Sequence, residues 1–426
     1  MEDNYENMDL ENLIIKNKEY YRLKKKKILL IVLPIILLIA LVITLIIVFR
    51  PKPDNKINCH YQILNGNENI HLININDDSE YNLIINGSNY GKKNSFIFNK
   101  PGLYEVTFDF KNKLNSLESF FEGINNLIDA DFSNLQFDNI TSMANLFKSC
   151  YNLNKVFFNN KTPNLENVSN IFHNCISLDI VDLNFNSSKI RAMDSMFRQC
   201  TKLTSLDISN FNLENAINTS YMFQDCINLK EIKFNNNTLT ENLEDMNSMF
   251  NGCKSLEYIN TKIFKVNKVT NLSYTFSKCY KLIEIDLSNF KTENARELSG
   301  TFSGCYNLKR INLINFDTSK VTKMDFMFKD LINLTSLDIS NFNLTSVINT
   351  SSMFQGCANL KEIKFNNDTL TENLEDMNSM FKGCFYLEDI NTEIFKVDKV
   401  TNLSYTFSQC FTLTELNLSN FKTENV

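Results

Sequence analysis

The stretch "MDSMFRQCTKLTSLDISNF" at residues 193–211 decides the fold, because variants of it recur along most of the chain. The apolar residues of its first half are spaced i, i+3, i+4 and i+7, as on one face of a two-turn helix; they are Met193, Met196, Phe197 and Cys200. The second half follows the L-x-x-L-x-L pattern of a leucine-rich-repeat strand, with Leu203, Leu206 and Ile208. Neither half can be buried alone, so successive units are expected to stack.

The cysteines give the period of the repeat. They occupy positions 150, 175, 200, 226, 253, 279, 305, 357, 384 and 410. The one double step skips a unit in which Leu331 takes the cysteine position, and Ile124 takes it one unit upstream of Cys150. We therefore predict an α/β repeat solenoid over 114–426, with about twelve turns of ~26 residues and a short strand plus a short helix in each turn.

The repeated cysteine is interpreted as a buried packing position. Ile124 and Leu331 can replace a buried apolar residue, but not a metal ligand or a disulfide partner. Disulfides between turns stay an alternative, because stacked turns would lie about 4.8 Å apart. Metal sites of the C-x-x-C kind are absent from the sequence, so no metal and no cofactor are expected. The phenylalanine three places earlier, from Phe121 to Phe407, is expected to form a core spine.

A longer period overlies the short one. The segment that begins "LTSLDISNFNL" at Leu203 is repeated almost whole from Leu334, and the match continues to "LSNFKTEN" at 287 and 418. Such a duplication favours an expandable scaffold over a fixed active site. Because a solenoid normally needs a polar terminal cap, we expect the sequence to be truncated at its C-terminus or capped in another way.

The composition and motifs argue against two classes of function. The formal net charge is −6 and no basic stripe interleaved with aromatics is present, so no nucleic-acid partner is expected. The three histidines and the lack of a Gly-rich phosphate loop or a G-x-S-x-G turn argue against an enzyme. No catalytic residue is therefore proposed.

An uninterrupted apolar run at 28–49 is long enough to span a bilayer, at about 1.5 Å per residue. A cleaved signal peptide is the alternative, although the run is long for one and no small-residue cleavage site follows. Basic residues gather on the N-terminal side, which predicts a cytosolic tail at 1–27 and a single-pass type II membrane protein with extracellular repeats. Tyr5–Met8 and Asp9–Ile14 resemble sorting signals, but an ordinary solvated tail without such signals would show the same short patterns.

Residues 54–113 precede the repeat and alternate apolar and polar residues between Gly, Asn and Pro positions. This pattern predicts strands and hairpins that form a small membrane-proximal β cap. Cys59 lies here, outside the repeat phase. It is either a free buried thiol or a partner in an intermolecular disulfide, and in the second case it could set oligomerisation.

The units "MFxxCxxLxxLDLSNFxTxxV" resemble BspA-like leucine-rich repeat surface proteins, specifically the mycoplasma and protist subgroup. The resemblance covers about 114–426. It implies a right-handed solenoid with strands on the concave side and short helices outside, and a role in adhesion or recognition at the cell surface. Departures are Ile124 and Leu331 at the cysteine position, units such as "LEYINTKIF" at 256–264 that lack the "SNF" loop, and the N-terminal apolar run in place of a lipoprotein signal.

The residues between the strand leucines should point away from the core and could contact a partner. The candidate partner-binding residues are Thr204, Ser205, Asp207, Lys233, Glu284, Asp286, Thr335, Ser336, Asp338 and Lys364. An ordinary solvated strand face would show the same pattern. N-x-[ST] motifs give candidate glycosylation sites: Asn86, Asn139, Asn167, Asn186, Asn218, Asn236, Asn271, Asn333, Asn343, Asn349, Asn367, Asn402 and Asn417.

These observations together predict a membrane-anchored cell-surface protein whose repeats mediate protein–protein or cell and matrix adhesion and recognition. The expected partner is an extracellular protein or glycan. The alternative is a structural or antigenic surface-coat protein without a specific ligand.

Overall fold

The computed structural model describes residues 54–75, 79–158, 162–237, 239–368, 370–419 and 421. The chain divides into two compact units, Met1–Pro53 and Asp54–Val426, and the description that follows concerns the second. The expected tail at 1–27 and the apolar run at 28–49 lie outside the described residues.

The first part of this unit is a small antiparallel β structure. Its strands are β1 (Lys56–Ile63), β2 (Glu68–His71), β3 (Tyr81–Ile85), β4 (Ser88–Asn89), β5 (Ser95–Phe98) and β6 (Gly102–Phe110). Alternate residues of β1 are buried, as one-sided burial of a strand requires. β1 pairs antiparallel with β6 on one side and with β7 (Leu127–Asp131), the first strand of the repeats, on the other.

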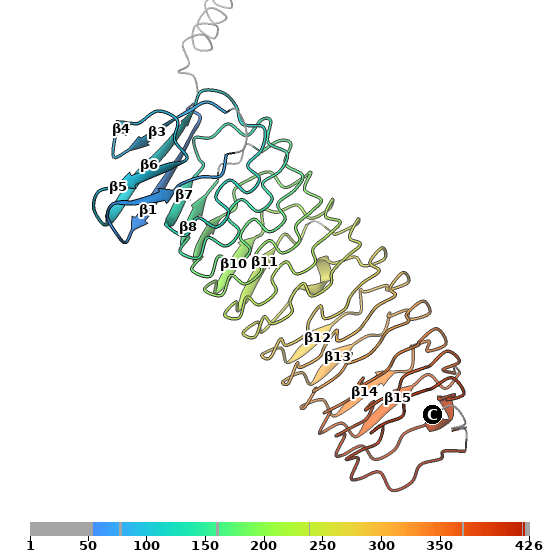
Figure 1. Ribbon diagram of the computed structural model, residues 1–426. Helices are drawn as coiled ribbons and strands as arrows, with labels where there is room; N and C mark the ends of the chain where they lie inside the picture. The colour runs from blue at the N-terminus through green and yellow to red at the C-terminus, as the bar shows by residue number, and fades with distance from the viewer. Residues whose placement is uncertain are drawn as a thin grey trace, which may run out of the picture. The chain divides into compact units, whose positions relative to one another are not determined.

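This shared strand joins the two parts in one sheet of order β4-β3-β6-β1-β7-β8-β9. An unpaired strand at the end of a solenoid would offer its backbone groups to other chains. β1 occupies that edge of β7 and satisfies its N–H and C=O groups. Figure 1 shows the N-terminal strands at the start of the stacked coils.

The repeats continue as parallel strands, each pairing with the strand one coil away. They are β8 (Lys155–Phe157), β9 (Ile180–Asp182), β10 (Ser205–Ile208), β11 (Glu231–Phe234), β12 (Glu284–Asp286), β13 (Arg310–Asn312), β14 (Ser336–Ile339) and β15 (Glu362–Phe365). Parallel pairs join β7 to β8, β8 to β9, β10 to β11, β12 to β13 and β14 to β15. A second series of parallel bridges runs from Ser142 to Asn402 at one position per coil.

The prediction of an α/β solenoid with a short helix in each turn is wrong. The repeats form a β-solenoid, and the described residues contain no α-helix. Two three-residue 3₁₀ turns, η1 (Thr261–Ile263) and η2 (Thr392–Ile394), are the helical elements that the described ranges contain. The "MxxMFxxC" segment instead forms consecutive turns, as the backbone hydrogen bonds of residues 193–200 show.

In that segment alternate residues bond in different directions. The N–H groups of Ser195 and Phe197 donate to carbonyls of the next coil at 2.8 Å each. The N–H groups of the alternate residues donate to the carbonyl three residues earlier, as the N–H of Cys200 does to the carbonyl of Phe197 at 3.0 Å. A helix would bond every N–H within the segment. Here half of these bonds hold neighbouring coils together.

Left-handed residues produce this alternation. Ser195 and Gln199 have φ angles of 55° and 61°, and a positive-φ pair four residues apart recurs from Ser119 and Gly123 to Tyr405 and Gln409. A right-handed helix needs negative φ throughout, so two such residues in every segment exclude it. The i, i+3, i+4, i+7 spacing predicted the buried positions but not the backbone that presents them.

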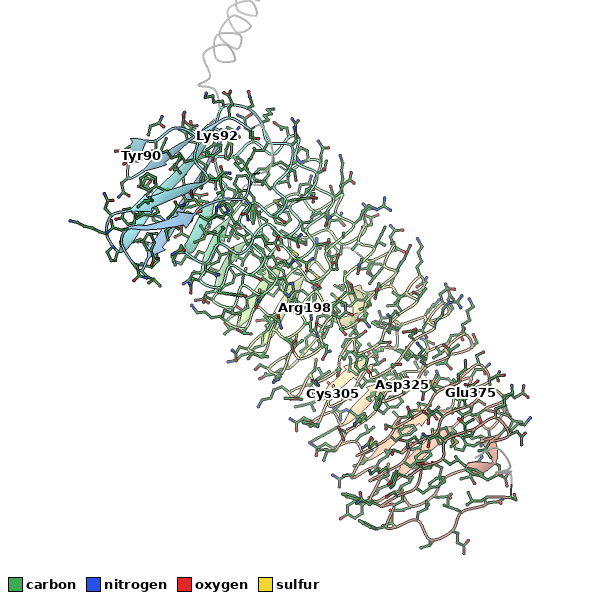
Figure 2. All side chains as sticks on the ribbon, in the orientation of Figure 1. Tyr90, Lys92, Arg198, Cys305, Asp325 and Glu375 are labelled. Carbon is green, nitrogen blue, oxygen red and sulfur yellow. The ribbon has the colours of Figure 1, made fainter. Side chains whose placement is uncertain are left out.

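The predicted phenylalanine spine is present. Twelve rings from Phe121 to Phe407 stack in sequence, with centroids 5.4 to 5.9 Å apart and ring planes within 19° of parallel. Each cysteine thiol of the repeat donates to the carbonyl of the spine phenylalanine one coil back, as Cys305 does to Phe276 at 3.0 Å. Figure 2 marks Cys305 among the stacked coils. The cysteine is therefore a packing residue that also joins coils.

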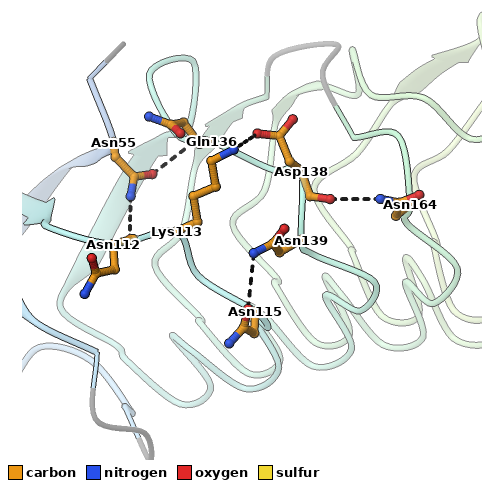
Figure 3. Close-up of polar contacts among 8 residues, drawn as sticks. All are labelled: Asn55, Asn112, Lys113, Asn115, Gln136, Asp138, Asn139 and Asn164. Atoms are coloured by element: carbon orange, nitrogen blue, oxygen red, sulfur yellow. Dashed lines mark hydrogen bonds and ion pairs between the residues drawn. The ribbon is translucent and has the colours of Figure 1, made fainter. Parts of the chain in front are cut away.

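Asparagine side chains join the coils on the outside. Around the first coils, Asn164 Nδ2 donates to the carbonyl of Asp138 at 2.8 Å, and Asn139 Nδ2 approaches Asn115 Oδ1 at 3.4 Å. Asn55 donates to the carbonyl of Asn112 within the β cap and accepts the N–H of Gln136 on the first coil, which links the two (Figure 3). The abundance of asparagine thus has a structural cause, because a short amide can bond the backbone one coil away.

The localisation expected from the sequence needs correction. Within the part of the chain that the structure describes, no helix is long and apolar enough to cross a membrane. The expectation of a single-pass type II membrane protein with extracellular repeats is corrected to this finding and is not proposed again.

Candidate binding face

The exposed side of the repeat strands is the candidate functional surface. We call it the strand face and define it as the exposed side chains of β10 to β15, the residue before each strand, and the strandless segments 257–260 and 388–391. All ten sequence-predicted partner-binding residues are exposed and lie on it: Thr204, Ser205, Asp207, Lys233, Glu284, Asp286, Thr335, Ser336, Asp338 and Lys364.

Strand register brings opposite charges together on neighbouring coils. Asp207 lies opposite Lys233, and Asp338 lies opposite Lys364. Glu284 lies opposite Arg310, whose guanidinium pairs with its carboxylate. Arg310 was not among the sequence-predicted residues, because its pairing with Glu284 depends on the register between coils. Such exposed pairs contribute little to stability, so their side chains can exchange partners at low cost.

The aspartates of the face have a local structural role as well. Asp207 accepts hydrogen bonds from the N–H and the Oγ of Ser209, at 3.0 and 2.6 Å. Asp338 accepts the same two bonds from Ser340. These hydrogen bonds from serine lower the pKa of both carboxyls. Both side chains are therefore negatively charged at neutral pH and fixed in orientation.

The face is interrupted at Tyr258. Strands β10–β11 and β12–β13 belong to separate sheets, and the coil between them has η1 and no strand. Asn260 caps η1 by accepting the N–H of Lys262 at 3.3 Å. The Tyr258 side chain is 69% exposed, which is unusual for a large aromatic ring. The signal in the sequence was the departure "LEYINTKIF" from the repeat.

Two open grooves flank this interruption. One, of about 690 Å³, lies on the β12–β14 side and is lined by Tyr258, Lys262, Glu284, Lys309 and Arg310 among others. The second, of about 990 Å³, lies on the β11 side and shares Tyr258 and Lys262. An aromatic ring between charged walls is typical of protein-recognition surfaces, where tyrosine and arginine are enriched.

The described residues show no metal cluster on this face or elsewhere: no three His, Cys, Asp or Glu lie close enough together to hold an ion. His60 contacts Asp129, with Nδ1 and Oδ1 2.8 Å apart, at the junction of the β cap and the repeats. Burial, followed by the charge of Arg198, lowers the pKa of His173 on a different part of the coils.

The candidate glycosylation sites fall into two groups. Six asparagines are exposed: Asn86, Asn139, Asn186, Asn236, Asn367 and Asn417. Seven are only half-exposed: Asn167, Asn218, Asn271, Asn333, Asn343, Asn349 and Asn402. Most of the second group hold turns, as Asn218 does by accepting the N–H of Ser220 at 2.9 Å.

The cysteines are free thiols, and all but the half-buried Cys410 are buried. Burial raises the pKa of the Cys305 thiol to about 12, which keeps it protonated and unreactive at neutral pH. Cys59 is 1% exposed within β1, between β6 and β7. A disulfide between chains through Cys59 would require this sheet to open.

Comparison with known protein families gives a match over the repeats. The family described as "Mycoplasma protein of unknown function, DUF285" matches residues 115–239, 233–312, 281–389 and 364–426. The chain belongs to this family. The DUF285 match covers the whole repeat region, which agrees with the mycoplasma-type repeats recognised in the sequence. No curated protein matches the chain.

Proposed function

We propose that the chain is a recognition scaffold that binds a protein partner through its strand face. The observation that carries the proposal is the interruption at Tyr258, where an exposed aromatic ring lies between two open grooves with charged walls. Buried aromatic anchors surrounded by charged residues supply most of the binding energy at many protein interfaces. Tyr258 therefore combines an exposed aromatic ring with a strandless coil and two adjacent grooves, which together support a binding role.

The sequence resemblance supports the same role. The repeats resemble those of BspA-like surface proteins, for which adhesion and recognition are the expected functions. We propose this relationship on the residue pattern alone. An adhesion role needs a stable scaffold with a variable exposed face, and the repeat separates buried packing positions from exposed ones in this way.

The proposal is tested by comparing two matched double variants of the full chain. Tyr258→Ala with Lys309→Ala removes an aromatic ring and a cation from the strand face. Tyr90→Ala with Lys92→Ala removes the same two side-chain types from the exposed surface of the β cap (Figure 2). Immobilised wild-type chain is used to recover binding proteins from cell and matrix preparations.

We expect the same protein to be recovered by the wild type and the cap variant, and to be lost with the strand-face variant. A loss of at least tenfold in affinity is expected for a central aromatic anchor. Recovery that is equal for all three chains would refute a role for this face. Failure to recover any protein would favour a structural component without a specific ligand.

A further inference from the structure

Three lysines gather around Tyr280, in the segment that leads from the consecutive turns of a coil to its strand. Lys278 lies two residues before Tyr280, and Lys281 follows it directly. Lys254 occupies the repeat position of Tyr280 one coil back, and Tyr306 occupies it one coil forward. We call these five residues the lysine patch. The lysines and Tyr306 are exposed, and Tyr280 is half-buried.

The aromatic rings of the lysine patch stack along the coils. The ring centroids of Tyr280 and Tyr306 are 4.9 Å apart, and the ring planes lie within 13° of parallel. Lys254 Nζ lies over the ring of Tyr280, 5.7 Å from its centroid. Because these two contacts come from opposite neighbouring coils, both faces of the Tyr280 ring are covered. The hydroxyl edge of the ring is the part left for a ligand.

The lysines of the patch form no ion pair among the described residues. Other lysines of the repeats do pair with acids, as Lys323 does with Glu297 at 3.1 Å. The chain as a whole has a formal net charge of −6. Unpaired lysines on two neighbouring coils of such a chain produce a local positive potential, which attracts anions.

Three acids mark the limits of the patch. Asp225 and Asp330 occupy the repeat position of Lys278 two coils back and two coils forward. Glu257 lies three residues after Lys254, on the strand face. A ligand with negative groups therefore has to lie between these acids, along the line of coils from Lys254 to Tyr306.

The internal duplication shows that the fold does not need these lysines. Residues 203–295 and 334–426 are nearly the same sequence, and the cysteines and leucines beside the patch are the same in both copies. At the positions of Lys254, Lys278 and Lys281, the second copy has no lysine; the residues there are Phe385, Gln409 and Thr412. The two copies therefore share the buried positions and differ in the charge of this surface.

The main chain of the patch already has partners. Asn307 Nδ2 donates to the carbonyl of Tyr280 at 2.7 Å, and Asn333 Nδ2 donates to that of Tyr306 at 2.8 Å. An acidic peptide that adds to a sheet edge needs free backbone groups. A single-stranded nucleic acid needs free ring faces for its bases. The patch offers instead ammonium and hydroxyl groups, which donate to anionic oxygen atoms.

We propose that the lysine patch binds a linear sulfated polysaccharide that lies along the coils. Its donors come from three successive coils and cover about 10 Å. Sulfate groups recur along such a chain at intervals set by its sugars, and the coils hold the donors at fixed intervals as well. A ligand whose charges are carried by substituents needs no main-chain partner. The patch lies outside the strand face and takes another class of ligand, so this inference does not depend on the proposed protein partner.

The test measures the affinity of the full chain for heparin, a sulfated probe, at several salt concentrations. The patch variant is Lys278→Gln with Lys281→Thr, which introduces the residues that the second copy already has at these positions. The control variant, Lys268→Gln with Lys320→Thr, makes the same changes in the loops before the second bridge series. Both variants lose two positive charges, so the comparison holds net charge constant.

We expect the control variant to bind heparin as the wild type does, and the patch variant to bind about tenfold more weakly. The slope of log Kd against log salt should fall by about two in the patch variant, one for each lysine. Unsulfated heparosan, polyglutamate and single-stranded DNA should bind the wild type more weakly than heparin does.

Lysine acetylation of the wild-type chain gives a second readout that needs no variant. Heparin should protect Lys254, Lys278 and Lys281 from acetylation and leave Lys268 reactive. A wild type that does not bind heparin, equal losses in the patch and control variants, or equal protection of Lys268 would overturn the proposal. Heparosan, polyglutamate or DNA that bound as tightly as heparin would overturn it as well, because the patch would then not select sulfate groups.

Discussion

The glycine of the segment "MFQGC" at residues 353–357 shows how single residues set the backbone of this repeat. Gly356 has a φ angle of 75°, and a Cβ atom there would lie 2.2 Å from Oδ1 of Asp330 on the neighbouring coil. Gly123 occupies the same repeat position with a φ of 74°, but nothing lies within 4 Å of its Cβ direction. A comparison of the two positions therefore distinguishes the cost of the left-handed backbone from the cost of crowding between coils.

We predict that Gly356→Ala destabilises the solenoid more than Gly123→Ala. Both variants force alanine into a left-handed conformation, at a cost of about 1 kcal/mol. Only the first also displaces Asp330, which adds an overpacking cost of about 1–3 kcal/mol. Thermal and denaturant midpoints measure the difference. Equal losses would show that Asp330 moves aside freely.

The thiols differ in reactivity by burial. Burial raises the pKa of Cys305 to about 12 and that of the half-buried Cys410 to about 11. We predict that iodoacetamide labels Cys410 first in the native protein, because the thiolate is the reactive form and this thiol is partly accessible. The labelling rate should rise about tenfold per pH unit between pH 7 and 10, as the thiolate fraction does. Mass spectrometry of native and urea-treated samples tests this, and preferential labelling of Cys305 would contradict it.

At the scale of the element, the sequence predicted which residues are buried better than it predicted the backbone. The periodic Phe, Met and Cys positions are buried as expected, because hydrophobic burial depends on spacing. The same i, i+3, i+4, i+7 spacing arises in a helix and in consecutive turns, so spacing alone could not distinguish them. Gly, Asn and Asp before the cysteine, as in Gly252, Asn174 and Asp225, were the available signal for left-handed residues.

The candidate site was predicted in part for the same reason. Strand alternation placed residues such as Asp207 and Lys233 correctly on the exposed side. It could not find Tyr258 and Arg310, because their importance depends on the break in the sheet and on register between coils. Those features follow from three-dimensional stacking. A unit that departs from its repeat, such as 256–264, was the place to look.

The phenylalanine spine is the element that holds the coils together. Phe302 is fully buried and stacks on Phe276 and Phe328 at 5.8 and 5.7 Å. We predict that Phe302→Ala destabilises its region by about 3–5 kcal/mol through loss of burial and a residual cavity. Phe157→Ala, at a ring that is 40% exposed, should have a much smaller effect.

Hydrogen exchange is the suitable measurement for this pair of variants. Because each coil contacts only its neighbours, the loss of protection should be greatest in the coils next to Phe302 and should fade with distance. The N-terminal strands β1 to β6 should keep their protection. A uniform loss over all coils would show that the solenoid unfolds as one cooperative unit and would contradict the local role of the spine.

At the scale of the whole molecule, the buried thiols together make the stability of the fold depend on pH. Burial raises the pKa of each repeat cysteine above its ordinary value of 9.0, to about 12 for Cys150, Cys226, Cys305 and Cys357. In the unfolded chain the thiols ionise near pH 9, whereas in the folded chain they stay protonated. The unfolded state therefore binds fewer protons between pH 9 and 12, so stability falls as the pH rises through this window. The contribution of the thiols is fully present below pH 9.

We predict a steep alkaline loss of stability that scales with the number of buried thiols. A triple variant with Cys200→Ser, Cys279→Ser and Cys305→Ser removes three of these titrations. Serine can still donate to the phenylalanine carbonyl one coil back, as the thiols do at 3.0 to 3.3 Å. The variant should be less stable at pH 7, because a hydroxyl is costlier to bury than a thiol, but its denaturant midpoint should fall less between pH 8 and 10.5. Tyrosine and lysine titrations are common to both chains and cancel in the comparison. Parallel curves for the two proteins would show that the buried thiols do not control alkaline stability.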